Sequence, residues 1–93
     1  MIEELRFDLV QKCLIEEDRR CITLVRLVVH EEHRGIGVGT AVLQELKLQA
    51  RKKGKTLRLV VDPQLDDTGR QRLVRFYRQR GFHLMSDGET MIY

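Results

Sequence analysis

Apolar and polar residues alternate in part near the start of the chain. Over residues 5–15 this alternation favours a strand, although Leu9, Val10, Cys13 and Leu14 also share one face of a helix. We predict a strand for this segment.

A second apolar segment, Cys21–Val29, is rich in the β-branched residues that sheet interiors favour. Only the polar residues 16–20 separate it from the first segment, and a short polar connection of this kind is typical of a turn. The two segments are therefore predicted to form a hairpin.

The segment Val38–Lys53 has the periodicity of a helix. Its apolar residues recur at four-residue steps, with one more beside them: Val42, Leu43, Leu46 and Ala50. The last turn is basic, which suits the negative end of the helix dipole, and Gly54 can cap it. The pattern predicts one helix with a single buried face.

Residues 56–61 form the next apolar run and predict a strand. Because a helix precedes it, this strand should run parallel to the one before that helix, through a right-handed crossover. A second helix is predicted over residues 69–80, with Asp66, Asp67 or Thr68 as its N-cap.

The second helix carries a buried stripe of Leu73, Phe76 and Tyr77, and Gly81 ends it. Residues 82–84 and 90–93 then indicate a terminal antiparallel hairpin. The complete order is β-β-α-β-α-β-β, which predicts an α/β (α+β) fold with a central mixed sheet.

The 93 residues carry a formal charge of +3 and predict a single domain over residues 1–93. No apolar run approaches the ~20 residues of a membrane span, and the acidic start lacks the features of a secretory signal, so we expect a cytoplasmic protein.

Cys13 and Cys21 are too few for a disulfide framework and are expected to be reduced. The histidines show no zinc-ligand spacing, so no metal is assigned.

Three alternating glycines, Gly35, Gly37 and Gly39, lie between the second strand and the first helix. Glycine lets the backbone approach a ligand closely, and the first helical turn offers N–H donors to an anion. The spacing excludes the dinucleotide-binding fingerprint, and the P-loop is excluded because no Gly-Lys-Ser/Thr begins the helix. Arg34-x-x-Gly37-x-Gly39 instead has the form Gln/Arg-x-x-Gly-x-Gly/Ala.

This loop motif is one of the features by which the chain resembles the GNAT superfamily of acyl-CoA N-acyltransferases, over roughly residues 21–93. The order of elements is that family's core, and residues 76–82, Phe-Tyr-Arg-Gln-Arg-Gly-Phe, are similar to its second signature. The resemblance implies a minimal N-acetyltransferase that lacks the usual N-terminal strand and helices. It also implies acetyl-CoA as co-substrate and direct attack by a primary amine.

The resemblance further implies which residues hold acetyl-CoA. The strand residues Leu27, Val28 and Val29 would pair with the pantetheine arm, and a backbone N–H near Val29 would polarise the thioester carbonyl. The loop and first helical turn would bind the pyrophosphate through Arg34, Gly35, Ile36, Gly37, Val38, Gly39 and Thr40.

Tyr77 stands where the family places the general acid that protonates the leaving thiolate. A phenol with a pKa near 10 is protonated at neutral pH and can donate that proton. The alternative reading of Tyr77 is a core aromatic on the helix stripe.

No general base is evident. Some members of the family place a glutamate on the strand, and the matching position here is Thr23, which cannot serve. His30, Glu31 and Glu32 lie close to the loop, and histidine titrates nearest neutral pH. Direct attack by an amine that loses its proton to water is equally compatible.

Five arginines crowd the second helix: Arg70, Arg72, Arg75, Arg78 and Arg80. The aromatic residues of this helix fall on its buried stripe, so no platform for stacking bases is implied and nucleic-acid binding is not favoured. We interpret most of these arginines as a solvated face. Arg80, or the end of the helix near Arg70 and Arg72, can instead meet a phosphate of CoA.

The short N-terminal region leaves the acceptor wall of the family incomplete. A second subunit in a homodimer completes the site, or the site is an open groove for a small-molecule or protein amine, or it does not function. The competing hypothesis is a non-catalytic acyl-CoA-binding or interaction module with the same fold.

Overall fold

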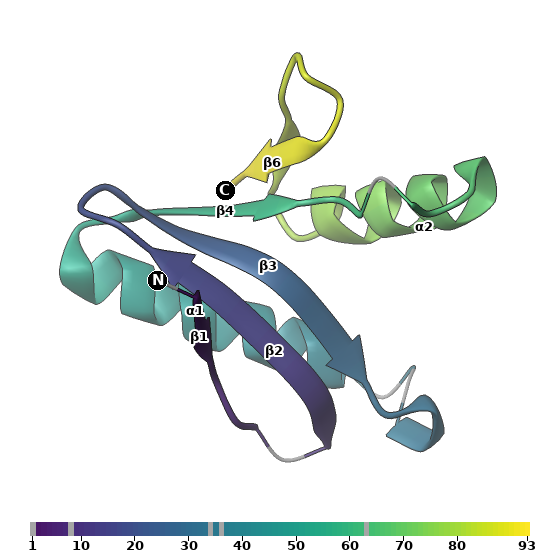
Figure 1. Ribbon diagram of the computed structural model, residues 1–93, viewed down its shortest axis with the longest axis horizontal. Helices are drawn as coiled ribbons and strands as arrows, with labels where there is room; N and C mark the ends of the chain where they lie inside the picture. The colour runs from purple at the N-terminus through teal and green to yellow at the C-terminus, as the bar shows by residue number, and fades with distance from the viewer. Residues whose placement is uncertain (1, 8, 34, 36, 63) are drawn as a thin grey trace.

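Six strands form one mixed sheet in the order β1-β2-β3-β4-β6-β5, and two helices complete the fold (Figure 1). The computed structural model describes residues 2–7, 9–33, 35, 37–62 and 64–93. The elements are β1 (Ile2–Glu4), β2 (Val10–Glu17), β3 (Cys21–Val29), the 3-10 turn η1 (Glu31–His33), α1 (Val38–Lys53), β4 (Thr56–Val60), α2 (Asp67–Arg78), β5 (His83–Leu84) and β6 (Thr90–Ile92). The predicted mixed fold is confirmed, with one strand added at its N-terminal end.

The added strand, β1, has no strand signal in its sequence. Its residues are Ile-Glu-Glu, and all three are exposed. Antiparallel pairing with β2, which places Ile2 opposite Glu16, holds β1 at the edge of the sheet. Because this pairing uses the backbone, the side-chain pattern does not reveal it.

The strand predicted over residues 5–15 begins only at Val10 and extends to Glu17. Leu9 has φ +69°, a left-handed conformation that interrupts extended backbone. Leu5 and Phe7 pack against the core from the connection between β1 and β2. The apolar positions Leu5 and Phe7 therefore reflect burial of side chains in the connection, whereas residues 10–15 belong to the paired strand β2.

Strands β3 and β4 are parallel, as predicted, but they stay together over only part of their length. Their register runs from Cys21↔Thr56 to Leu24↔Leu59, and residues 25–29 of β3 continue beyond it. Figure 1 shows the two strands diverging, with α2 following β4. The divergence opens the sheet beside the start of α1.

Helix α1 has the bounds that the sequence predicts. Its C-cap is Gly54 in the left-handed conformation, with φ +66°, and the Gly54 N–H bonds to the carbonyls of Ala50 and Arg51. The apolar face predicted for this helix is buried.

Helix α2 begins at Asp67, two residues before the predicted start at Gly69, because Asp66 caps it. The Asp66 carboxylate accepts a hydrogen bond of 2.7 Å from the Gly69 N–H. Regular helix ends at Arg78, and Gly81, with φ +95°, turns the chain toward β5.

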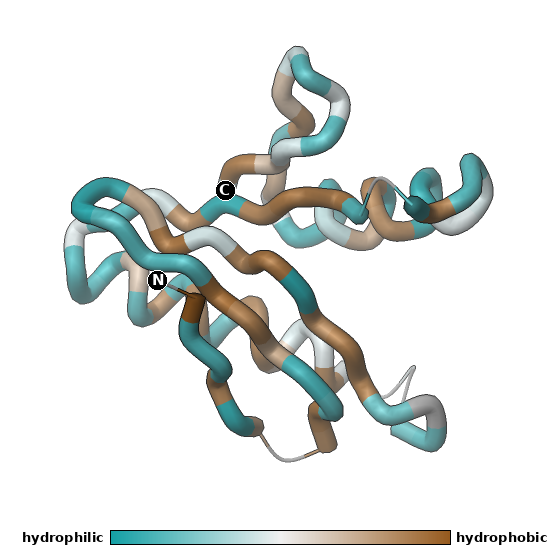
Figure 2. The backbone as a smooth tube through the Cα atoms, in the orientation of Figure 1, coloured by the Kyte–Doolittle hydropathy of each residue, from teal (hydrophilic) through white to brown (hydrophobic). Residues whose placement is uncertain are grey.

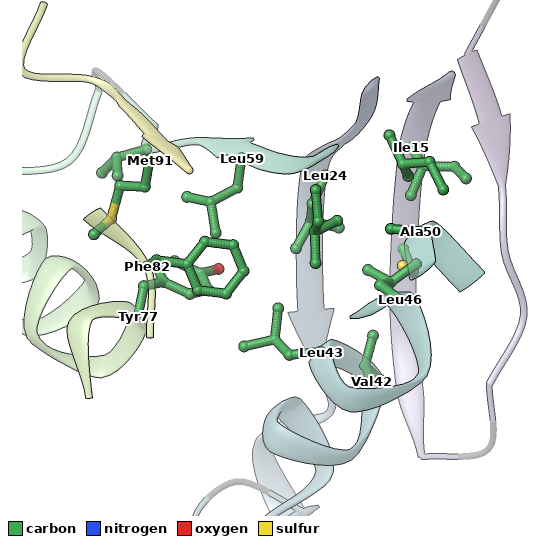
Figure 3. Close-up of a cluster of buried hydrophobic side chains, with 14 residues drawn as sticks. Ile15, Leu24, Val42, Leu43, Leu46, Ala50, Leu59, Tyr77, Phe82 and Met91 are labelled. Atoms are coloured by element: carbon green, nitrogen blue, oxygen red, sulfur yellow. The ribbon is translucent and has the colours of Figure 1, made fainter. Parts of the chain in front are cut away.

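Both helices and the sheet share one core. Side chains of α1 meet Tyr77 of α2 and Phe82 at its centre, as Figure 3 shows, together with Leu24, Leu59 and Met91 from the sheet. Figure 2 shows apolar residues along β3 and β4, whereas hydrophilic residues gather on the β2–β3 turn and the C-terminal end of α1. Helix α1 lies behind the sheet in Figure 1, and within the described part of the chain no helix covers the face of β2 and β3 toward the viewer.

Candidate functional site

A cleft of about 760 Å³ opens where β3 and β4 diverge. Its walls are the end of β3, the glycine loop, the first turn of α1 and one face of α2. The described residues that line it are Leu27, Val28, Val29, His33, Gly35, Gly37, Val38, Gly39, Thr40, Gly69, Arg72, Leu73, Phe76, Tyr77 and Arg80. Its volume lies in the range of sites that enclose small organic ligands, roughly 300–1,000 Å³.

The cleft brings together most of the residues that the sequence assigns to acetyl-CoA. The strand residues Leu27, Val28 and Val29 lie on one wall and Tyr77 lies on another. Two of the assigned residues, Arg34 and Ile36, fall outside the described residues.

Two glycines of the loop, Gly35 and Gly37, have left-handed backbone. Gly35 and Gly37 have φ +83° and φ +86°, and a Cβ built on either would meet nothing within 4 Å. Gly37 is the N-cap of α1 and provides no side-chain acceptor, and the first turn of α1 contains no acidic residue. The residues of this turn line the cleft, and no capping side chain bonds to its N–H donors, which is the arrangement that phosphate groups use at helix N-termini.

Gly39 has a different structural role from the other two glycines. A Cβ on Gly39 would lie 3.3 Å from Cζ of Phe76, which is tight for a carbon contact. The missing side chain lets α2 approach the first turn of α1 closely. Gly39 therefore permits the close approach of Phe76 and also forms part of the wall of the cleft.

The Tyr77 ring is part of the core, and Tyr77 is also one of the residues that line the cleft. It is only 7% exposed and packs edge to face against Phe76 and Phe82, with ring centroids 5.3 and 5.8 Å away. Burial, with a smaller contribution from Cys13, raises the pKa of Tyr77 to about 12. The phenol therefore stays protonated throughout the physiological range and retains a proton to donate.

Burial of Tyr77 and Cys13 predicts a loss of stability at alkaline pH. Burial also raises the pKa of the Cys13 thiol to about 11, so the fold favours the neutral form of both groups. Both pKa values are raised on folding, so burial of the neutral groups contributes its full stability below their pKa values in the unfolded chain, near 8.5 for cysteine and 10 for tyrosine. This stability is lost as the pH rises toward 12. Urea unfolding at several pH values should show the stability of Tyr77→Phe falling less steeply than that of the wild type between pH 10 and 12. Parallel curves for the two proteins would contradict the assignment.

Two of the five arginines predicted on the second helix reach the cleft. Arg72 and Arg80 line it, whereas Arg75 and Arg78 are exposed on another face. No acidic side chain occurs among the described lining residues. The described wall is therefore positively charged, as an anionic ligand requires.

The structure places the candidate bases differently from the sequence analysis. His30 is exposed and is not among the described lining residues, whereas His33 lines the cleft and its ring lies 6.3 Å from that of His30. Thr23 is buried and its hydroxyl accepts a hydrogen bond of 2.7 Å from Arg58 Nε. His33 was missed because its position depends on the 3-10 turn η1, which has no periodic signal in the sequence.

The wall formed by α2 was also missed in part. Gly69, Arg72, Leu73, Phe76 and Arg80 follow helical spacing along α2 and the turn after it. The sequence analysis assigns Leu73 and Phe76 to a core stripe and offers Arg72 and Arg80 only as contacts for a phosphate of CoA. A stripe that includes two arginines is more polar than a core face, and that difference could have indicated the cleft.

The described residues contain no group of three or more His, Cys, Asp or Glu side chains arranged to hold a metal ion. Among the helices of the described part of the chain, none has the length and apolar character needed to cross a membrane.

A protein-family model described as "Acetyltransferase (GNAT) domain" matches residues 8–84. A comparison with curated sequences gives no match.

Solved structures share the fold along nearly the whole chain. The anti-CRISPR protein AcrVA5 is 20% identical, with a TM-score of 0.80 over 99% of this chain and 97% of its own. A GNAT family acetyltransferase from Elizabethkingia anophelis, with acetyl-CoA bound, is 16% identical, with a TM-score of 0.69 over 98% of this chain and 71% of its own. The PaiA N-acetyltransferase from Thermoplasma acidophilum, in complex with coenzyme A, is 22% identical, with a TM-score of 0.66 over 89% of this chain. The present chain spans about half of the Thermoplasma protein, 51% of its length.

Proposed function

Because the chain belongs to the GNAT family of acyl-CoA N-acyltransferases, we propose that its cleft binds acetyl-CoA and transfers the acetyl group to a primary amine. The observation that carries the proposal is the meeting of the glycine loop, the end of β3 beyond its pairing with β4, and Tyr77 around one cleft. Two of the similar structures contain CoA or acetyl-CoA, which supports the choice of co-substrate.

The residues of the cleft fit acetyl-CoA in both shape and charge. Gly35 and Gly37 leave open space above the start of α1, where side chains would otherwise block a pyrophosphate. Arg72 adds positive charge on the opposite wall. Leu27, Leu73 and the ring of Phe76 provide an apolar surface for the pantetheine arm.

Each wall has a separate part in the proposed reaction. When bound, acetyl-CoA supplies an activated acyl group on a thiol leaving group. The glycine loop and the first turn of α1 hold the anionic end, and the backbone of residues 27–29 orients the arm and the thioester. Tyr77 holds the proton that the departing thiolate needs. An amine that has lost its proton to water attacks the thioester carbon directly, and the carbon–sulfur bond breaks as Tyr77 protonates the thiolate. The proton that the nitrogen then releases restores the Tyr77 phenol through water.

The acceptor is proposed to approach from the helix-free face of the sheet. In Figure 1 no described helix lies over that face beside the divergence of β3 and β4. An open approach can admit a small-molecule amine or an amine of a protein.

Calorimetric titration with acetyl-CoA tests the ligand class, with a nicotinamide dinucleotide as the control. We expect saturable binding of acetyl-CoA and none of the dinucleotide, because the loop lacks the dinucleotide spacing. Release of free CoA from acetyl-CoA is then measured across a panel of small amines and lysine peptides. Binding without release under any amine would identify a non-catalytic acyl-CoA-binding module, and absence of binding would overturn the proposal.

A further inference from the structure

Arg80 is the residue through which the end of α2 is attached to the start of α1. Its Nε donates to Thr40 Oγ1 at 2.8 Å, and its Nη1 donates to the Phe76 carbonyl at 2.8 Å. The guanidinium also lies over the Phe76 ring, with Cζ 3.6 Å from the ring centroid. One side chain therefore contacts the first turn of α1 and the last turn of α2 at the same time.

The backbone of Arg80 adds to this attachment. Its N–H donates to the Tyr77 carbonyl at 3.0 Å, and the Phe82 N–H donates to the same carbonyl at 3.1 Å. The Arg80 carbonyl accepts a hydrogen bond of 2.7 Å from Lys47 Nζ of α1. The turn that carries Arg80 is thus folded around Tyr77 and held against α1.

From these contacts we infer that Arg80 is a positioning residue, which fixes the distance between the Tyr77 hydroxyl and the glycine loop by linking α2 to Thr40. The inference rests on the proposed function, in which the loop holds one end of acetyl-CoA and Tyr77 must reach the sulfur at the other end.

The contact between Arg80 and Thr40 matters because proton donation by Tyr77 requires a precise distance. Proton donation needs the phenol within hydrogen-bond reach of its acceptor, and an error of about 1 Å can cost on the order of 100-fold in rate. Tyr77 lies on α2, whereas the glycine loop leads into α1, so the distance between them depends on contacts between the two helices. Only an arginine has the planar fork that can donate to a hydroxyl and to a carbonyl at once from this position.

The experiment compares kcat and KM for acetyl-CoA in Arg80→Lys, Thr40→Val and the double variant. We expect each single variant to lower kcat by roughly tenfold or more. KM for acetyl-CoA should change much less, because the anion site at the start of α1 is built from backbone N–H groups, which Thr40→Val keeps. Since both variants break the same link, the double variant should be little slower than Arg80→Lys alone. Thr40→Ser, which keeps the hydroxyl, should restore most of the rate lost in Thr40→Val. Arg78→Leu, an exposed change on the same helix, is the matched control and should retain wild-type kinetics.

Two outcomes overturn the inference. If Arg80→Lys raises KM for acetyl-CoA and leaves kcat intact, Arg80 acts as a ligand for an anionic group of CoA. If the effects of Arg80→Lys and Thr40→Val multiply, the two residues act independently.

Failure of the proposed function has a different signature. Wild-type protein that neither binds acetyl-CoA nor releases CoA would overturn that function and the catalytic role of Arg80 with it. The link itself is measured separately, by a double-mutant cycle on the free energy of unfolding with the same variants. Coupling between Arg80 and Thr40 in that cycle would then identify a purely structural link.

Discussion

Tyr77→Phe is expected to slow acyl transfer by roughly 100-fold or more while leaving acetyl-CoA binding unchanged, because general acid catalysis contributes about 10²–10⁴-fold. The change removes only the hydroxyl and keeps the ring that packs between Phe76 and Phe82. Since burial raises the pKa of Tyr77 to about 12, the wild-type rate should show no loss from ionisation of this phenol below about pH 11. The measurements are kcat from CoA release and Kd for acetyl-CoA from calorimetry.

The chain contains a matched control for this substitution. Tyr93 is the other tyrosine, and it is 56% exposed on β6's C-terminal side, so Tyr93→Phe makes the same chemical change away from the cleft. Tyr93→Phe should retain the wild-type rate. If Tyr77→Phe has a kcat close to that of Tyr93→Phe, Tyr77 is a core aromatic and the acid is another group or water.

The features that the sequence predicts well are those with a strong local signal. Helix α1 has a single apolar face, a basic last turn and a glycine that can adopt positive φ, and its bounds agree at both ends. The parallel arrangement of β3 and β4 follows from one helix between two strands, which leaves few alternatives. The glycine loop is also a local signal, and its described residues Gly35, Gly37 and Gly39 line the cleft, while the binding of a pyrophosphate there stays a prediction.

The features that were missed depend on contacts between distant segments. Pairing of β1 with β2 uses only backbone groups, and the positive φ of Leu9 has no signal in its residue type. The role of Gly39 in admitting Phe76, and the link between Arg80 and Thr40, appear only when α2 lies against α1. Residues more than 35 positions apart in sequence, such as Thr40 and Arg80, meet only in the folded chain, so periodicity cannot predict their contact.

Gly37→Ala tests whether the glycine loop binds acetyl-CoA, and Gly54→Ala at the other end of α1 is its control. Gly37 and Gly54 lie at opposite ends of α1, both have positive φ, and a Cβ on either would meet nothing within 4 Å. Alanine at either position should therefore cost a similar amount of stability, about 1–2 kcal/mol for holding an L-residue in the left-handed region.

Only Gly37→Ala is expected to weaken acetyl-CoA binding, by roughly tenfold or more, which corresponds to about 1.4 kcal/mol. The added methyl group stands in the glycine loop, and relief of the strained φ of +86° moves the N–H donors of the first turn of α1 away from the anion. Calorimetric Kd values for both variants, set beside their free energies of unfolding, separate ligand binding from folding. Equal losses of affinity in Gly37→Ala and Gly54→Ala would mean that the loop acts only as a turn, because a change at the far end of α1 cannot touch an anion at its start.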